Sequence, residues 1–198
     1  AKNALCVGIF IISDKIRPNV ALLMEQIKEL GVEEVVMLTG DSAKNAEVIA
    51  KQAGLTTYYA NLLPAQKVDM IQALRKTYDP IAMIGDGIND APALATATVG
   101  VAMGAYGSAI SAEAGDIVFL VDDLHKLKEA ISISQWTIHI AKESIFIGIG
   151  LSFILMIIAA FGYIEPAIGA MLQEIIDVAV ILNALRVRSK DMPALFPK

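Results

Sequence analysis

Two aspartates, an asparagine and two glycines follow directly after the apolar run at residues 81–84. The sequence reads Gly85-Asp86-Gly87-Ile88-Asn89-Asp90, so Asp86 and Asp90 flank the amide of Asn89. Carboxylate and amide oxygens are the hard ligands that Mg²⁺ prefers in proteins. A plain turn is the alternative, but a turn requires neither two aspartates nor the following Pro92. The run therefore predicts a magnesium site that includes Asp86 and Asp90.

Two weaker signals precede this run. Thr39-Gly40-Asp41 follows the apolar residues 35–38 and offers a hydroxyl group and backbone amides at the start of a predicted helix, where an anion can bind. Lys67 lies in the first turn of another predicted helix, which Pro64 opens. An amphipathic helix usually exposes such a lysine to water. Neither feature identifies a site by itself.

Three polar residues interrupt the apolar stretch 167–185. Gln173 and Asp177 are spaced as i and i+4, which places them on one helix face, with Glu174 about 100° around the helix. Ionisable residues within an apolar span are costly and commonly functional. Their oxygens suit a divalent cation, whereas thiolates would select Cu(I). The alternatives are hydrogen bonding between helices and exposure near a membrane surface.

Short apolar runs alternate with amphipathic stretches over the first part of the chain, which is typical of a βαβ fold with a parallel sheet. In such sheets ligands bind outside the carboxyl ends of the strands. The sequence predicts strands at residues 7–12, 35–38, 58–60, 81–84, 99–103 and 117–121. It predicts helices at 19–30, 44–53, 65–76 and 91–97, a helical turn at 108–113, and a long helix from about 124.

The chain of 198 residues is 56% hydrophobic and only 19% charged, with a mean hydropathy of +0.59. A soluble domain carries about 25% charged residues, and the deficit here is local, because residues 144–164 contain none. Two stretches, 141–163 and 167–185, are long enough to cross a bilayer. We therefore expect an α/β region at 1–135, an all-α transmembrane hairpin at 136–190, and a tail at 191–198.

Basic residues flank both predicted spans: Lys126, Lys128 and Lys142 before the first, and Arg186, Arg188 and Lys190 after the second. The positive-inside rule then places the α/β region and both termini in the cytoplasm. The formal net charge of −5, without a basic stripe, argues against a nucleic-acid partner. The single cysteine, Cys6, excludes a disulfide scaffold.

Several motifs together resemble the phosphorylation domain of the P-type ATPases. They are Met37-Leu38-Thr39-Gly40-Asp41, Lys67 within Leu63-Pro64-Ala65-Gln66-Lys67, and the run from Gly85 to Asp90 with Ala91-Pro92-Ala93-Leu94. Asp14-Lys15-Ile16-Arg17-Pro18 and Leu182-Asn183-Ala184-Leu185-Arg186 resemble the branch of that family that transports heavy metals. The resemblance covers nearly the whole chain and keeps the family order.

The resemblance implies a haloacid dehalogenase-like fold for the α/β region, with Mg²⁺ as cofactor and ATP as substrate. It also implies a role for each polar residue of the motifs: Thr39 and Gly40 hold the phosphoryl group, Lys67 neutralises it, Asp86 ligates Mg²⁺, Asn89 and Asp90 complete the phosphate and magnesium network, and Asp41 lies toward the nucleotide. The partners implied are a divalent heavy-metal cation, ATP and the lipid bilayer, and the location is the plasma (inner) membrane.

The phosphorylated aspartate of that family lies in an Asp-Lys-Thr-Gly-Thr motif, which this sequence does not contain. We therefore expect the chain to be the C-terminal piece of a larger pump, with the remainder of the pump polypeptide as a partner, and to be inactive toward ATP by itself. The alternatives are a membrane-anchored phosphatase of the haloacid dehalogenase type and a non-catalytic regulator.

The polar residues of the predicted spans do not identify the transported metal. The zinc branch of the family has an aspartate in the last span and usually a lysine in the preceding one, whereas this sequence has Ser152 in that neighbourhood. The pair Gln173-Glu174 resembles the His-Glu pair of another divalent-metal branch. The nearby small residues Gly148 and Ser152 are spaced for close helix packing.

Overall fold

The computed structural model describes residues 16–85, 88–104 and 113–188. The chain divides into two compact units, residues 1–125 and 126–198. The predicted strand at 7–12 and the tail at 191–198 lie outside the described residues, as do Asp86, Gly87 and most of the predicted turn at 108–113.

The first unit alternates helices and strands as the sequence predicts. Its helices are α1 (Val20–Glu29), α2 (Ala43–Gln52), α3 (Pro64–Arg75) and α4 (Ala91–Thr96), with a 3-10 turn η1 (Ile88–Asp90). Its strands are β1 (Val36–Leu38), β2 (Thr57–Tyr59), β3 (Ala82–Gly85), β4 (Val99–Met103) and β5 (Ile117–Phe119). Every predicted element within the described residues is present, with ends shifted by at most a few positions.

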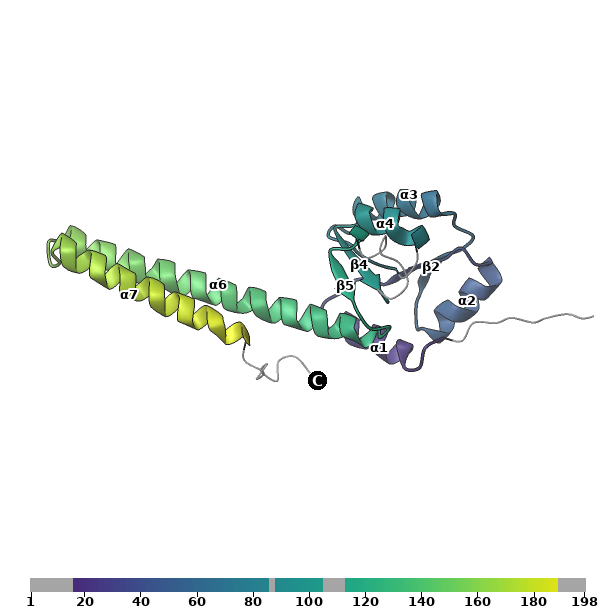
Figure 1. The fold of residues 1–198 in the computed structure, drawn as a ribbon, viewed down its shortest axis with the longest axis horizontal. Coiled ribbons are helices and arrows are strands. Elements are labelled where there is room, and N and C mark those ends of the chain that lie inside the picture. Colours follow the sequence, from purple (N-terminus) through teal and green to yellow (C-terminus); the bar gives the residue numbers. More distant parts are fainter. Residues whose placement is uncertain (1–15, 86–87, 105–112, 189–198) are drawn as a thin grey trace, which may run out of the picture. The chain divides into compact units, whose positions relative to one another are not determined.

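The strands pair in parallel throughout the part of the unit that the structure describes. β1 pairs with β2, and β3, β4 and β5 pair in that order, with Ile84 opposite Val101 and Val101 opposite Ile117. Helix α4 packs against β3 and β4 and lies beside α3, as Figure 1 shows for the two helices. The prediction of an α/β fold with parallel sheets is confirmed.

Apolar side chains from both helices and strands form the core of this unit. The fully buried members include Leu23 of α1, Ile71 of α3, Leu94 of α4 and Val101 of β4. The strand β4 is central in its sheet and is almost entirely buried, as expected for a parallel strand covered on both faces. Glycine ends α1 and α2, because Gly31 and Gly54 adopt the positive φ angles of 92° and 70° that other residues rarely adopt.

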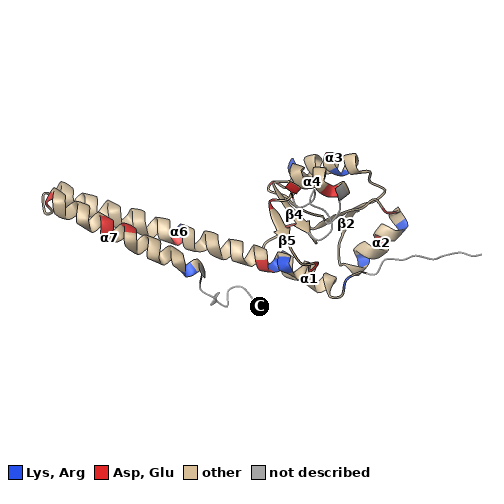
Figure 2. Ribbon diagram, in the orientation of Figure 1, with Lys and Arg blue, Asp and Glu red and all other residues tan. Residues whose placement is uncertain are grey.

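The second unit contains two long apolar helices, α6 (His125–Ala160) and α7 (Pro166–Ala184), and the latter continues into the short 3-10 helix η2 (Leu185–Arg188). Both helices are long and apolar enough to cross a membrane. Figure 2 shows few charged residues along them, with acidic positions on α7. The predicted spans at 141–163 and 167–185 fall within this pair, whereas the division near residue 135 falls inside α6 and stays a prediction.

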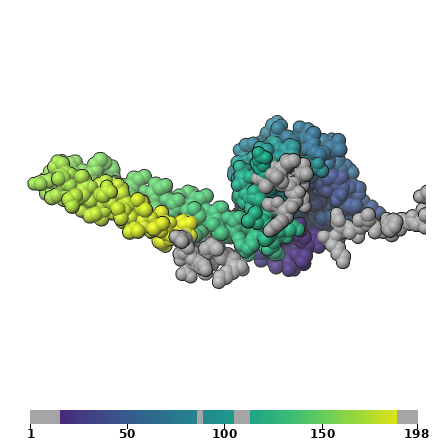
Figure 3. Space-filling model, in the orientation of Figure 1, coloured from purple at the N-terminus to yellow at the C-terminus, as the bar shows by residue number. Residues whose placement is uncertain are grey.

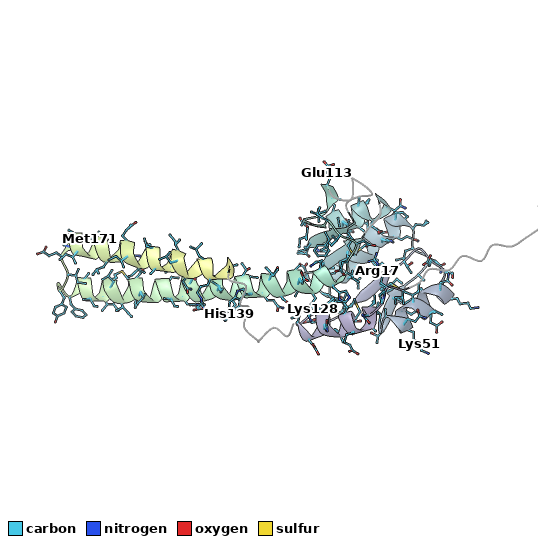
Figure 4. All side chains as sticks on the ribbon, turned by 60° about the horizontal axis from the view of Figure 1, so that its bottom comes forward. Arg17, Lys51, Glu113, Lys128, His139 and Met171 are labelled. Atoms are coloured by element: carbon cyan, nitrogen blue, oxygen red, sulfur yellow. The ribbon has the colours of Figure 1, made fainter. Side chains whose placement is uncertain are left out.

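Apolar side chains cover the outside of this hairpin. Phe146, Ile149 and Met171 are all exposed, and Figure 4 shows Met171 projecting from α7. A helix that is apolar all round belongs in a core or in lipid. The turn between the helices includes Gly162 at a φ of 81°, followed by Pro166 in the first turn of α7. The hairpin therefore has the surface expected of a membrane-embedded pair.

Candidate functional site

Lys67 and Asp90 form an ion pair at the carboxyl end of β3. The Lys67 Nζ lies 2.6 Å from Asp90 Oδ1, and the two side chains are only 15% and 14% exposed. The expectation that this lysine faces water, as is usual on an amphipathic helix, is therefore wrong. Desolvating an ammonium group is costly unless a carboxylate partner compensates, and Asp90 is that partner. The structure thus brings together two of the predicted site residues from segments 23 positions apart.

Gly85 makes room for this pair. A Cβ atom at Gly85 would lie 2.8 Å from Asp90 Cβ and 3.1 Å from Asp90 Oδ2. The first of these separations is shorter than real Cβ contacts allow, and Asp90 Cβ is fixed directly to the backbone. Glycine is therefore required at the end of β3 because η1 folds back against it.

Thr39-Gly40-Asp41 forms a tight loop after β1. The Asp41 amide donates to Thr39 Oγ1 at 3.1 Å, and the Leu62 amide donates to the Thr39 carbonyl at 3.0 Å. The Asn61 amide donates to the Asp41 carbonyl at 2.8 Å. A Cβ atom at Gly40 would lie 3.3 Å from the Leu62 carbonyl oxygen, so this loop approaches the 61–62 segment closely.

The 61–62 segment connects this loop to Lys67. Leu63 follows this segment and Pro64 then opens α3. The Leu63 amide donates to Gln66 Oε1 at 2.8 Å, which caps the helix start. The segment before α3 is therefore hydrogen-bonded to the loop after β1, while Lys67 in the first turn of α3 contacts Asp90 at the end of η1. Gln66 occupies the third position of the helix as in a capping box, but the N-cap is Leu63 and not a serine or threonine, so the sequence does not carry the usual signal.

The remaining predicted residues of this unit differ in exposure. Gly40, Asp41 and Asn89 are exposed, Thr39 is half-buried, and Asp86 lies outside the described residues. Among the described residues, no three carboxylate, imidazole or thiolate groups gather to hold a metal ion. The donors that are described, the Asp90 carboxylate and the Asn89 amide next to it, are hard oxygen groups and fit Mg²⁺. The magnesium and phosphate roles of these residues stay predictions.

Gln173 is the centre of a polar contact within the hairpin. Its Nε2 donates to Ser152 Oγ of α6 at 3.0 Å and to Asp177 Oδ1 of α7 at 3.0 Å. Gln173 and Asp177 therefore share one face of α7, as their spacing predicts. Gln173 is half-buried, whereas Glu174 and Asp177 are exposed. The alternative of hydrogen bonding between helices holds for Gln173, and the sequence did not show that Ser152 is its partner.

A second polar cluster joins the other end of the hairpin. Asn183 Nδ2 donates to Ser144 Oγ at 2.8 Å, and Arg186 donates to both Asn183 Oδ1 and Glu143 Oε1. Between the two clusters, a Cβ atom at Gly148 would lie 3.0 Å from Val180 Cγ2, so the helices approach closely there. Figure 3 shows the side chains of α6 and α7 packed against each other. These contacts fix an antiparallel register and agree with the predicted packing role of Gly148.

Known proteins match the first unit alone and also nearly the whole chain. Residues 3–98 match the family model described as haloacid dehalogenase-like hydrolase. The chain is 36% identical over 185 residues to the cadmium-transporting ATPase of Staphylococcus aureus, covering 93% of this chain and 25% of that protein. It is 40% identical over 181 residues to the copper-exporting P-type ATPase of Bacillus subtilis, covering 91% and 22%. The chain thus spans about a quarter of the length of these curated relatives.

A solved structure extends the match to the fold. The crystal structure of a zinc-transporting PIB-type ATPase in the E2.Pi state superposes with a TM-score of 0.82 at 34% identity, covering 89% of this chain and 28% of that one. The first unit is therefore a haloacid dehalogenase-like domain, and two long apolar helices follow it in the same chain. In sequence and fold the chain is similar to one portion of the P-type ATPases that transport heavy metals.

Proposed function

We propose that this chain supplies the magnesium-binding half of the phosphorylation site and a cation-binding hairpin to an ATP-driven pump for divalent heavy metals. The observation that carries the proposal is the Gln173–Asp177 contact within an apolar helix of a chain that also holds the Lys67–Asp90 pair. A phosphatase attached to a membrane would have no use for polar groups inside its anchor.

The residues after β1 and β3 would hold the phosphoryl group. Thr39 offers its hydroxyl group and Gly40 its backbone amide, while the Thr39 amide donates to the Tyr59 carbonyl. Lys67 offers a positive charge that is largely screened from water. Transfer of a phosphoryl group depends mainly on positioning and on cations near its oxygens. Asp90 holds Lys67 in place, and the exposed Asp41 would face the nucleotide.

Asp86 and Asp90 would bind Mg²⁺, with Asn89 completing the network. When bound there, Mg²⁺ would offset the negative charge on the phosphoryl oxygens. Of these residues, Asn89 and Asp90 are described, and they contribute oxygen donors in the 3-10 turn that follows β3. The nucleophilic aspartate would come from an Asp-Lys-Thr-Gly-Thr motif elsewhere in the pump polypeptide, so we expect this chain alone to form no acyl-phosphate with radiolabelled ATP.

The hairpin would contribute ligands for the transported cation. Gln173, Glu174 and Asp177 offer amide and carboxylate oxygens, which favour a divalent cation over Cu(I). Similar proteins include a cadmium-transporting ATPase and a cadmium, zinc and cobalt-transporting ATPase of Bacillus subtilis. We propose a substrate of that divalent class, in a plasma (inner) membrane with the α/β unit and both termini in the cytoplasm.

The test is a metal panel on the full-length protein that carries this chain, purified and reconstituted in vesicles. ATP hydrolysis is measured with Zn²⁺, Cd²⁺, Co²⁺ and Cu⁺ for the wild type and for Asp177→Ala. We expect stimulation by a divalent metal in the wild type and its loss in the variant. Metal stimulation that persists unchanged in Asp177→Ala would refute the assignment of the membrane site.

A further inference from the structure

We propose that Ser152 of α6 is a positioning residue of the membrane cation site, acting through the amide of Gln173. The proposal rests on the proposed function of Gln173 and Asp177 as ligands of a divalent cation. It adds a residue from the other helix, Ser152, which is hydrogen-bonded to the same amide as Asp177.

The observation is that one atom of Gln173 makes both polar contacts. Its Nε2 lies 3.0 Å from Ser152 Oγ and 3.0 Å from Asp177 Oδ1, so both N–H groups of the amide have an acceptor. The amide oxygen, Oε1, has no hydrogen-bond partner within the part of the chain that the structure describes. The amide is therefore held by its nitrogen, and its oxygen remains available to bind a cation.

The opposite orientation of the amide is unfavourable. If the amide were turned over, its oxygen would lie at about 3 Å from a carboxylate oxygen, and two acceptors would face each other. Without Ser152 the amide would keep one acceptor, Asp177, and would lose the second anchor that restricts its rotation. The Ser152 hydroxyl thus fixes the plane of the amide and with it the direction of the free oxygen. A free amide oxygen is a hard donor and a suitable ligand for a divalent cation.

The close approach of the two helices makes this contact possible. Ser152 is one helical turn from Gly148, where the absence of a side chain lets Val180 of α7 come within contact distance. A short side chain such as serine reaches Gln173 only if the helix axes are near each other. The charged groups beside this amide on α7 are Glu174 and Asp177 themselves, and the nearest charged residue of α6, Glu143, is bonded to Arg186 at the far end of the hairpin.

Ser144 offers a matched control. It is also a serine of α6 whose hydroxyl accepts a hydrogen bond from a side-chain amide of α7, with a similar donor–acceptor distance of 2.8 Å. It lies about two turns from Ser152, next to Asn183 and away from Glu174 and Asp177. If Ser152 serves only to pack the helices together, removal of either hydroxyl should have the same effect on the pump.

The experiment measures ATP hydrolysis by the reconstituted full-length protein against the concentration of the stimulating metal, supplied alone as Zn²⁺, Cd²⁺ or Co²⁺. For Ser152→Ala we expect the half-activating metal concentration to rise roughly fivefold, the equivalent of one neutral hydrogen bond, with the maximal rate within about a factor of two. Ser152→Thr keeps a hydroxyl group and should restore the wild-type value. Ser144→Ala should leave the half-activating concentration unchanged.

Three results would overturn the proposal, and they are distinguishable. If Gln173→Ala and Asp177→Ala abolish metal activation but Ser152→Ala behaves as Ser144→Ala does, the membrane site stands and the role of Ser152 is refuted. If Gln173→Ala and Asp177→Ala leave metal activation unchanged, the proposed function of the site fails and the role of Ser152 fails with it. A lower maximal rate in Ser152→Ala at an unchanged half-activating concentration also counts against positioning.

Discussion

Removal of one partner of the Lys67–Asp90 pair should destabilise the α/β unit more than removal of both. With the two side chains only 15% and 14% exposed, a single substitution leaves a charge largely excluded from water. Breaking a buried pair in this way costs about 3–5 kcal/mol, whereas replacing both partners is often close to neutral. We expect Lys67→Met and Asp90→Asn each to lower the free energy of unfolding by about 3 kcal/mol. The double variant should lose less than either single variant, that is, less than about 3 kcal/mol in total.

Hydrogen exchange of the whole chain in detergent micelles provides the measurement. The amides of β3 and β4 report opening of the sheet next to the pair, and the four proteins of the double-mutant cycle give the coupling free energy directly. Arg17→Ala is the control, because its ion pair with Asp122 is 42% and 63% exposed and such pairs contribute at most about 1 kcal/mol. Single substitutions that each cost under about 1 kcal/mol and add without coupling would refute the reasoning.

Three further predictions concern close approach and the polar contacts of the hairpin. Gly85→Ala should lower the free energy of unfolding by about 1–3 kcal/mol, because the new Cβ meets Asp90 Cβ at 2.8 Å; unchanged thermal unfolding would contradict this. Gly148→Leu should separate α6 from α7 near Val180, measured as a longer distance between spin labels on the two helices. Gly150→Leu is the control and should not change that distance, because nothing lies within 4 Å of a Cβ atom at Gly150. Asn183→Leu removes the side-chain amide that donates to the hydroxyl of Ser144, a residue that is only 4% exposed. We therefore expect the hairpin to lose about 1 kcal/mol of stability. Equal stability of variant and wild type in a denaturant titration would refute this.

The α/β elements could be predicted from the sequence because each leaves a local pattern. Helix α1 has apolar residues at helical spacing and ends before Gly31, and β4 is a continuous apolar run. Both patterns reflect which side chains must leave water, and the structure has them at the expected positions. The parallel pairing followed from the alternation of strands with helices.

The burial of Lys67 could not be predicted in the same way. The periodicity of α3 alone favours exposure, and only the position of Asp90, 23 residues later, changes that outcome. The same holds for Ser152 and Gln173, which are 21 positions apart and meet only because α6 and α7 pack in one particular register. Contacts of this kind depend on tertiary structure, and a pattern within one helix carries no information about them.

Under the proposed function, Glu174 and Asp177 lie where α7 would contact the rest of the pump. Both are exposed in the hairpin, and Glu174 forms no hydrogen bond or ion pair within the described residues. A carboxylate facing lipid near the middle of a membrane costs about 3 kcal/mol or more, so such residues face protein or water instead. Under the proposed function the α7 face that carries them is therefore covered by the remaining polypeptide of the pump. The cation ligands would then be completed by that polypeptide, since Gln173, Glu174 and Asp177 offer too few donors by themselves to enclose a cation.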